Sequence, residues 1–224
     1  MSTQPLRTTP RAHWQQELAQ AIRSPADLLQ RLQLSQEWQP AAERAAALFP
    51  LLVPESFLRR MVPGDPRDPL LLQVLPLAEE TESTPGFVTD PVDDAAAQRA
   101  PGLLQKYAGR ALLITTGACA VHCRYCFRRE YPYAEAPRQL VDWEPALAAL
   151  AADDSLHEVL LSGGDPLTLT DARLSALLER LEAIPHLRRV RLHTRLPIVL
   201  PARVTPGLIE RLRASRLTPI VVVH

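Results

Sequence analysis

The spacing of apolar residues differs between the two halves of the chain. In residues 1–102, apolar positions recur at helical spacing in stretches joined by proline-rich connections, which predicts a helical region. Its clearest start is Ser24–Asp27, where a hydroxyl at the N-cap precedes a proline and an acid in the first turn. Shorter helices are predicted at residues 41–49 and 55–61, whereas residues 76–101, which are rich in turn signals, are predicted to be irregular.

In the second region, residues 103–224, short apolar runs alternate with helical patterns. The runs predict strands at residues 111–116, 158–162, 190–194 and 219–223, and the first of these suits a strand buried on both faces. The stretches between them predict helices at residues 144–152, 174–181 (with Asp171 as the cap) and 206–214. Strands that alternate with single helices form right-handed βαβ units, so the fold class is α/β with a parallel sheet, open or closing towards a barrel. The chain stops at His224, directly after the fourth run, and we expect a fragment that lacks further βα units.

The charge balance narrows the classes of partner. The 224 residues include 25 basic and 25 acidic side chains, so the formal net charge is zero. Binding to nucleic acid or to an anionic membrane through bulk positive charge would need a basic excess, and neither partner is expected. No apolar run approaches the roughly 20 residues that span a bilayer. Residues 1–5 lack the charged and apolar segments of a secretory signal.

All three cysteines, Cys119, Cys123 and Cys126, fall within eight positions directly after the first predicted strand of the parallel sheet. An odd, tightly clustered set indicates metal or redox chemistry rather than a disulfide framework. Loops at this end of parallel strands carry the functional site in α/β folds. Three thiolates at this spacing can hold three corners of an iron–sulfur cubane and leave the fourth iron open. A structural zinc site with His122 or His157 is the alternative, although such sites usually pair two separate ligand knuckles.

The spacing C-x3-C-x2-C, with an aromatic residue before the last cysteine, resembles the signature of the radical S-adenosylmethionine (SAM) family. A single Gly-Gly pair, in Ser162-Gly163-Gly164-Asp165, follows the second predicted strand and resembles the glycine-rich element of that family, although it could also be a plain βα turn. The resemblance implies a [4Fe–4S] cluster whose open iron chelates SAM, with these four residues beside the amino end of SAM. It also implies an electron donor that reduces the cluster.

Longer stretches of the sequence point to one family within the radical SAM group. Residues 101–113, 126–129 and 193–205, together with Trp14–Leu18 in the helical region, look like the lysine 2,3-aminomutase family. Within it they look most like the branch that makes (R)-β-lysine for modifying elongation factor P. The resemblance implies an isomerase that interconverts L-lysine and (R)-β-lysine by a radical 1,2-amino shift and also uses pyridoxal 5′-phosphate. Two alternatives stay open: an aminomutase for free lysine or glutamate metabolism, and a non-catalytic zinc or iron–sulfur binding module.

The same resemblance implies roles for individual residues. Lys106, Tyr107 and Arg110 match positions that hold the phosphate of pyridoxal phosphate, and arginine suits this because its planar fork binds phosphate well. Arg128 matches the residue that binds the carboxylate of the substrate lysine, and Arg195 is expected to reach SAM. Lys106 is the only lysine of the chain. The lysine that forms the Schiff base is therefore expected beyond residue 224, and this chain alone is expected to be inactive.

The resemblance also implies an architecture and a location. The helical region is expected to precede a partial parallel (β/α) barrel of the radical SAM type, truncated after about four strands. Because the cluster needs reducing surroundings and no targeting segment is visible, we expect the cytoplasm. A homo-oligomer is compatible with the sequence.

Overall fold

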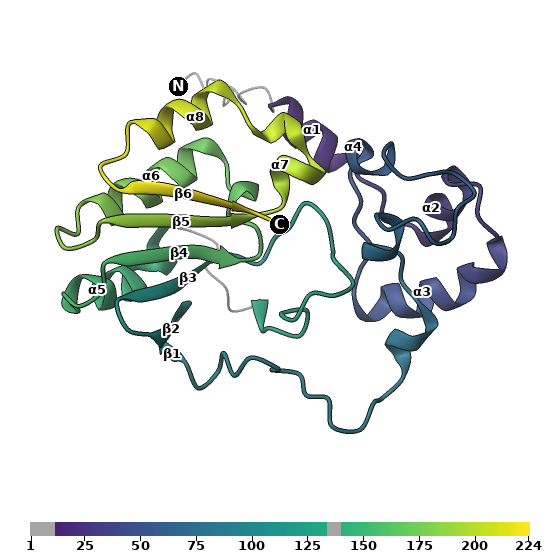
Figure 1. The fold of residues 1–224 in the computed structure, drawn as a ribbon, viewed down its shortest axis with the longest axis horizontal. Coiled ribbons are helices and arrows are strands. Elements are labelled where there is room, and N and C mark those ends of the chain that lie inside the picture. The colour runs from purple at the N-terminus through teal and green to yellow at the C-terminus, as the bar shows by residue number, and fades with distance from the viewer. Residues whose placement is uncertain (1–11, 134–139) are drawn as a thin grey trace, which may run out of the picture.

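The computed structural model describes residues 12–133 and 140–224, so the expectation about a secretory signal at residues 1–5 lies outside the described part. The α-helices are α1 (His13–Ala19), α2 (Pro25–Arg31), α3 (Gln39–Leu48), α4 (Glu55–Leu58), α5 (Glu144–Ala152), α6 (Asp171–Glu182), α7 (Leu196–Val199) and α8 (Pro206–Arg213). The strands are β1 (Gln98–Ala100), β2 (Leu103–Tyr107), β3 (Arg110–Thr116), β4 (Glu158–Gly163), β5 (Arg189–Thr194) and β6 (Thr218–Val223). Figure 1 shows the sheet on the left, α2, α3 and α4 on the right, and the segment after β3 between them.

The helical region follows the sequence pattern closely. The Ser24 hydroxyl accepts a hydrogen bond from the backbone N–H of Asp27 at 3.4 Å, and Pro25 opens α2, as predicted. Leu28, Leu29 and Leu32 are buried on one side of this helix. The apolar face of α2 therefore packs into the core.

The sheet confirms the α/β prediction. Its strands follow one another in the order β1 to β6, and the pairs β3–β4, β4–β5 and β5–β6 are parallel. All four predicted strands are present. Val159, Leu161, Val190 and Leu192, at the centre of β4 and β5, are fully buried.

The antiparallel strands β1 and β2 were not predicted. They form a hairpin around a two-residue turn, and β2 then pairs antiparallel with β3. Gly102 in the turn has φ +74°, a left-handed conformation that glycine adopts without strain. The hairpin escapes sequence analysis because β1 is only three residues long and contains the polar Gln98 and Arg99. Such a strand has no apolar run that a sequence pattern could detect, and it is a strand only because it pairs with β2.

The helices α5, α6 and α8 each connect one parallel strand to the next (Figure 1). Leu174, Leu177, Leu178 and Leu181 of α6 are at most 1% exposed, which confirms the predicted amphipathic helix. The predicted cap is wrong by one residue. The hydroxyl of Thr170 caps α6 by accepting from the N–H of Arg173, because Asp171 already has its place in the first turn.

The parallel arrangement places the carboxyl ends of β3, β4, β5 and β6 at one edge of the sheet. The segments that follow them begin at Gly117, Gly164, Arg195 and His224, and these segments therefore meet. None of the described helices is long and apolar enough to cross a membrane.

Candidate functional site

A cavity of about 340 Å³ lies at the carboxyl ends of the parallel strands. Each of the four segments that follow β3, β4, β5 and β6 contributes to its wall. The lining includes all three cysteines, Arg128, the sequence Ser162-Gly163-Gly164-Asp165, Arg195, and the two histidines His193 and His224. The fold thus gathers the cysteine and glycine motifs, which lie more than 35 residues apart in the sequence, around one space.

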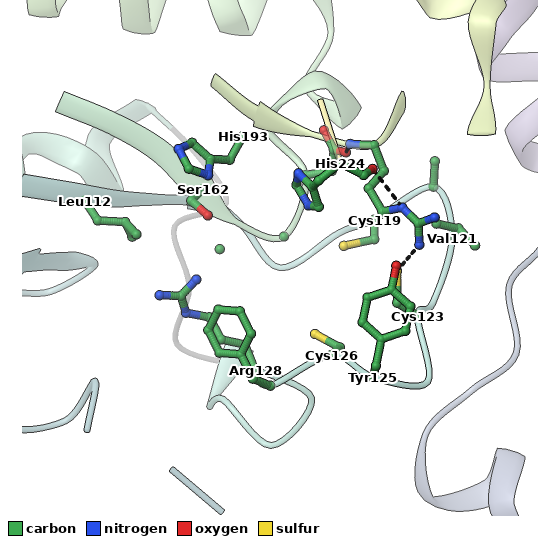
Figure 2. A pocket seen from close by; sticks show the side chains of 16 residues that line it. Leu112, Cys119, Val121, Cys123, Tyr125, Cys126, Arg128, Ser162, His193 and His224 are labelled. Carbon is green, nitrogen blue, oxygen red and sulfur yellow. Dashed lines mark hydrogen bonds between the residues drawn. The ribbon is translucent and has the colours of Figure 1, made fainter. Parts of the chain in front are cut away.

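The cysteines occupy the irregular segment after β3. All three thiols are free and half-buried, and Figure 2 shows Cys119 and Cys126 directing their sulfur atoms into the cavity. Burial raises the pKa of the Cys119 thiol, and the nearby Asp165 carboxylate raises it further. Burial likewise raises the pKa of Cys126. A bound metal would therefore supply the positive charge that these cysteines need to form thiolates.

The donor set fits an iron–sulfur cluster better than a zinc ion. In the described part of the chain, no three His, Cys, Asp or Glu side chains converge on one metal position. A cluster makes no such demand, because each cysteine binds a different iron. His122 cannot complete a zinc site beside the cysteines, because its Nδ1 lies 2.8 Å from the Pro50 carbonyl and its ring stacks on Phe49. His157 lies before β4, at the opposite end of the strand.

The glycine pair packs against the start of the cysteine segment. A Cβ on Gly164 would lie 2.4 Å from the backbone oxygen of Ala118, and Gly163 has φ +101°. The Gly164 N–H donates to the Thr116 carbonyl at 2.7 Å, and the Asp165 N–H donates to the Ala118 carbonyl at 2.8 Å. Their resemblance to the family's glycine-rich element places these glycines beside the amino end of SAM, with a plain βα turn as the alternative. In this structure Gly164 is required by close approach of the protein's own backbone.

The buried Asp165 carboxylate binds several groups in the wall of the cavity. It accepts hydrogen bonds from the Thr194 hydroxyl at 2.7 and 2.9 Å, from the Arg195 N–H at 2.7 Å and from the Leu167 N–H at 3.0 Å. Burial raises the pKa of this carboxyl, although these hydrogen bonds oppose the rise. Asp165 lines the cavity, as predicted, but its oxygens join the segment after β4 to the end of β5.

Arg195 connects this frame to the cysteines. Its Nη1 donates to the Cys123 sulfur at 2.8 Å and its Nε to the His224 carbonyl at 3.1 Å (Figure 2). Its Nη2 donates to Gln73 Oε1 at 2.5 Å. Its guanidinium also lies over the Tyr125 ring, 5.6 Å from the centroid. The buried guanidinium is therefore fixed on three sides. It contacts Cys123 directly, and because it also lines the cavity, its expected contact with SAM stays a prediction.

A second cavity of about 400 Å³ adjoins the first. Lys106, Tyr107 and Arg110, the residues predicted to hold a phosphate, line it together. Arg110 lies over the Tyr107 ring at 5.1 Å from the centroid, and Tyr107 is exposed. Leu112, Phe127 and Arg128 line both cavities. The structure thus brings the predicted phosphate residues next to Arg128, at the border of the cysteine cavity.

The helical region holds the cysteine segment from the other side. Glu80 accepts from Arg124 Nε at 2.9 Å and from Arg129 Nη1 at 2.8 Å. Both guanidinium groups lie 4.9 Å from the centroid of the Phe49 ring. Burial would raise the pKa of Glu80, but these hydrogen bonds outweigh it and hold the pKa below its ordinary value. The cysteine segment is therefore anchored on both flanks.

Comparison with known proteins shows which family the cysteine and glycine motifs belong to. Residues 113–222 match the radical SAM superfamily, and the match contains the three cysteines and the glycine pair. This part of the chain belongs to the radical SAM superfamily. A radical SAM domain implies a [4Fe–4S] cluster and SAM, which agrees with the three cysteines around one cavity.

The radical SAM domain and the helical region together are similar to curated aminomutases. L-lysine 2,3-aminomutase of Escherichia coli (strain K12) is 48% identical over 98% of this chain, and that of Haemophilus influenzae is 42% identical over 95%. The enzyme of Clostridium subterminale is 30% identical over 89% of the chain. The chain spans 64%, 63% and 48% of the length of these three relatives, respectively.

Several residues that contact or adjoin the predicted site residues were not singled out from the sequence. Asp94 pairs with two predicted site residues, and Gln73 binds Arg195, yet neither residue belongs to a motif or an element with a clear pattern. His193 lines the cysteine cavity, and its buried Nε2 has no hydrogen-bond partner within the described residues. Its place near the end of a predicted strand was a signal that could have singled it out.

Gly164→Ala should displace the cysteine segment. The new Cβ would meet backbone atoms of Ala118 that cannot rotate away, so we expect loss of most of the iron and a loss of about 1–3 kcal/mol in unfolding free energy. Iron analysis after anaerobic reconstitution and urea unfolding measure both effects. Gly207→Ala is the matched control, because no heavy atom lies within 4 Å of its added Cβ. Normal iron content in Gly164→Ala would contradict this account.

Arg195→Gln should make the cluster harder to reduce. Hydrogen bonds to cysteine sulfur stabilise the reduced cluster, and this change removes the donor that lies 2.8 Å from Cys123. An EPR-monitored redox titration of fully iron-loaded protein should give a more negative midpoint potential. Arg195→Lys, which retains a donor, should restore part of the shift, and the exposed Arg188→Gln should leave the potential unchanged. Equal potentials for Arg195→Gln and the unaltered protein would contradict the role of this hydrogen bond.

Proposed function

We propose that the chain is the radical SAM part of a lysine 2,3-aminomutase that interconverts L-lysine and (R)-β-lysine. The observation that carries the proposal is the junction of the two cavities at Arg128. On one side lie the three cysteines, and on the other lie Lys106, Tyr107 and Arg110. A radical generator and a phosphate-bearing cofactor would thus share one reaction space. The similarity to proteins named L-lysine 2,3-aminomutase over nearly the whole chain supports the same assignment.

In this proposal the cysteine cavity binds the cluster and SAM. A reduced [4Fe–4S] cluster with SAM on its open iron supplies the adenosyl radical. Cys119, Cys123 and Cys126 would hold three irons, and Arg195 would keep its donor on the Cys123 sulfur. Ser162, Gly163, Gly164 and Asp165 would form the wall beside the amino end of SAM. Val121, Leu112 and Phe127 add an apolar lining that limits water near the radical.

The second cavity would bind pyridoxal phosphate and the substrate carboxylate. Lys106 and Arg110 provide two cations and Tyr107 a phenol, which together suit a phosphate dianion. Arg128 lies between the cavities, so a lysine carboxylate bound there would place the substrate carbons near the cluster side. Bound pyridoxal phosphate would supply a conjugated C=N bond that accepts the radical while the amino group moves between neighbouring lysine carbons. The chain's own part is to bind and orient the two anions.

Lys106 is poorly suited to anchor the pyridoxal aldehyde. Its ammonium lies 2.6 Å from Asp94 Oδ1 and also donates to the Val92 carbonyl. A Schiff-base lysine needs a nitrogen that is free to attack the aldehyde, whereas the Lys106 nitrogen is held by Asp94 and the Val92 carbonyl. As Lys106 is the only lysine of the 224 residues, we propose that residues 1–224 alone do not turn over lysine.

Three further points complete the proposal. The β-lysine would serve the modification of elongation factor P, and the enzyme would act in the cytoplasm with an electron donor that reduces the cluster. We also propose that copies of the protein can associate into a homo-oligomer. If the product has this use, cells without the gene should contain elongation factor P that lacks β-lysine, as mass spectrometry of the purified factor would detect.

Product analysis tests the proposed reaction. The full-length protein, with pyridoxal phosphate, SAM and a reductant, should convert L-lysine to (R)-β-lysine, as chiral chromatography would detect. Cys123→Ser should form no product, because one iron loses its ligand. L-Glutamate should not react. Formation of β-glutamate, or of β-lysine by residues 1–224 alone, would contradict the proposal.

A further inference from the structure

Asp94 lines the second cavity and is the only carboxylate among the described residues that does so. Its side chain is 3% exposed. Its Oδ1 lies 2.6 Å from Lys106 Nζ, and its Oδ2 lies 2.6 Å from Arg128 Nε. One buried carboxylate therefore joins a residue predicted to hold phosphate to the residue predicted to hold the substrate.

We infer that Asp94 is a positioning residue that sets the spacing between the two anion-binding cations, Lys106 and Arg128. This inference rests on the proposed function, because the anions are the phosphate of pyridoxal phosphate and the carboxylate of an amino acid. Asp94 touches neither anion itself. It holds the two cations in the places from which they bind the anions.

The backbone around Asp94 is fixed before any ligand binds. The Asp90 carboxylate accepts hydrogen bonds from the N–H groups of Asp94 and Ala95, both at 2.9 Å. Asp93 has φ +57°, which turns the chain so that Asp94 points inward while Asp93 stays exposed. The carboxylate is therefore a fixed reference point for two longer, more flexible side chains.

The charges support a positioning role. Lys106 and Arg128 without Asp94 would repel each other, and the carboxylate between them lowers the charge of this trio to +1, to which Arg110 adds a further cation in the same cavity. Burial would raise the pKa of Asp94, but hydrogen bonds from Arg128 and Lys106 outweigh it and hold the pKa below its ordinary value. Asp94 therefore stays ionised at neutral pH.

Both cations keep donors for ligands. Arg128 uses its Nε and, at 3.5 Å, its Nη2 towards Asp94, while its guanidinium lies over the Phe127 ring at 4.7 Å. A guanidinium has five N–H donors, so others remain for a substrate carboxylate. Phe127 and Asp94 together hold the guanidinium plane, and a bidentate contact with a carboxylate depends on that orientation.

The test uses Asp94→Asn in the full-length protein, which keeps the side-chain shape and removes the charge. We expect a rise of about tenfold or more in the Kd for pyridoxal phosphate and in the KM for lysine, because each cation loses a charge-assisted hydrogen bond. Pyridoxal absorbance during titration and steady-state assays measure these constants. The EPR change caused by SAM should be retained, since Asp94 does not line the cysteine cavity. Asp93→Asn is the matched control, as asparagine also adopts positive φ.

The outcomes separate this inference from the proposed function. If the unaltered protein binds no pyridoxal phosphate, the proposed function fails. If it binds pyridoxal phosphate and Asp94→Asn has the same Kd and KM as Asp93→Asn, the inference is wrong. If Asp94→Asn does not fold, Asp94→Glu decides, because it keeps the charge and moves the carboxylate by one methylene. A folded Asp94→Glu protein with unchanged constants would overturn the inference, and raised constants would support it.

Discussion

The cysteine site depends on a backbone contact between the segments that follow β3 and β4. Gly164 lies so close to Ala118 that no side chain fits between them, and two backbone hydrogen bonds extend the β3–β4 pairing past the ends of the strands. From there Asp165 holds the end of β5, and Arg195 returns to the Cys123 sulfur. These contacts therefore start at Ala118 and return to Cys123, both in the cysteine segment. The parallel sheet thus fixes an irregular segment in place, as preorganised binding of a cluster requires.

The helical region takes part in the same site. Glu80 and Gln73 belong to it by sequence, and they bind Arg124, Arg129 and Arg195 around the cysteines. Burying these ion pairs costs solvation free energy, so they contribute more to orientation than to net stability. Asp94 does the same at the border of the second cavity. In both places a polar side chain fixes an arginine: Gln73 holds Arg195, which donates to the Cys123 sulfur, and Asp94 holds Arg128, which lines both cavities.

The sequence was sufficient for the parts of the fold that rest on local pattern. The four parallel strands, the helices between them and the convergence of the cysteine and glycine motifs all follow from apolar periodicity and from the rule that sites lie at strand carboxyl ends. The β1–β2 hairpin, Asp94 and Gln73 could not be predicted in this way. Each depends on a partner distant in sequence, and a three-residue strand or a single acid in an irregular segment has no period. The role of Gly164 was also invisible, because the sequence does not show that Ala118 lies against it.

The central claim is that the three cysteines hold an iron–sulfur cluster with one open iron that binds SAM. Anaerobic reconstitution followed by EPR of the dithionite-reduced protein, with and without SAM, tests this most directly. The account predicts a [4Fe–4S]⁺ signal that changes when SAM is added, because a new ligand on the open iron alters its electronic environment. An EPR-silent, well-folded protein that contains zinc would contradict the account and would favour a structural metal module instead.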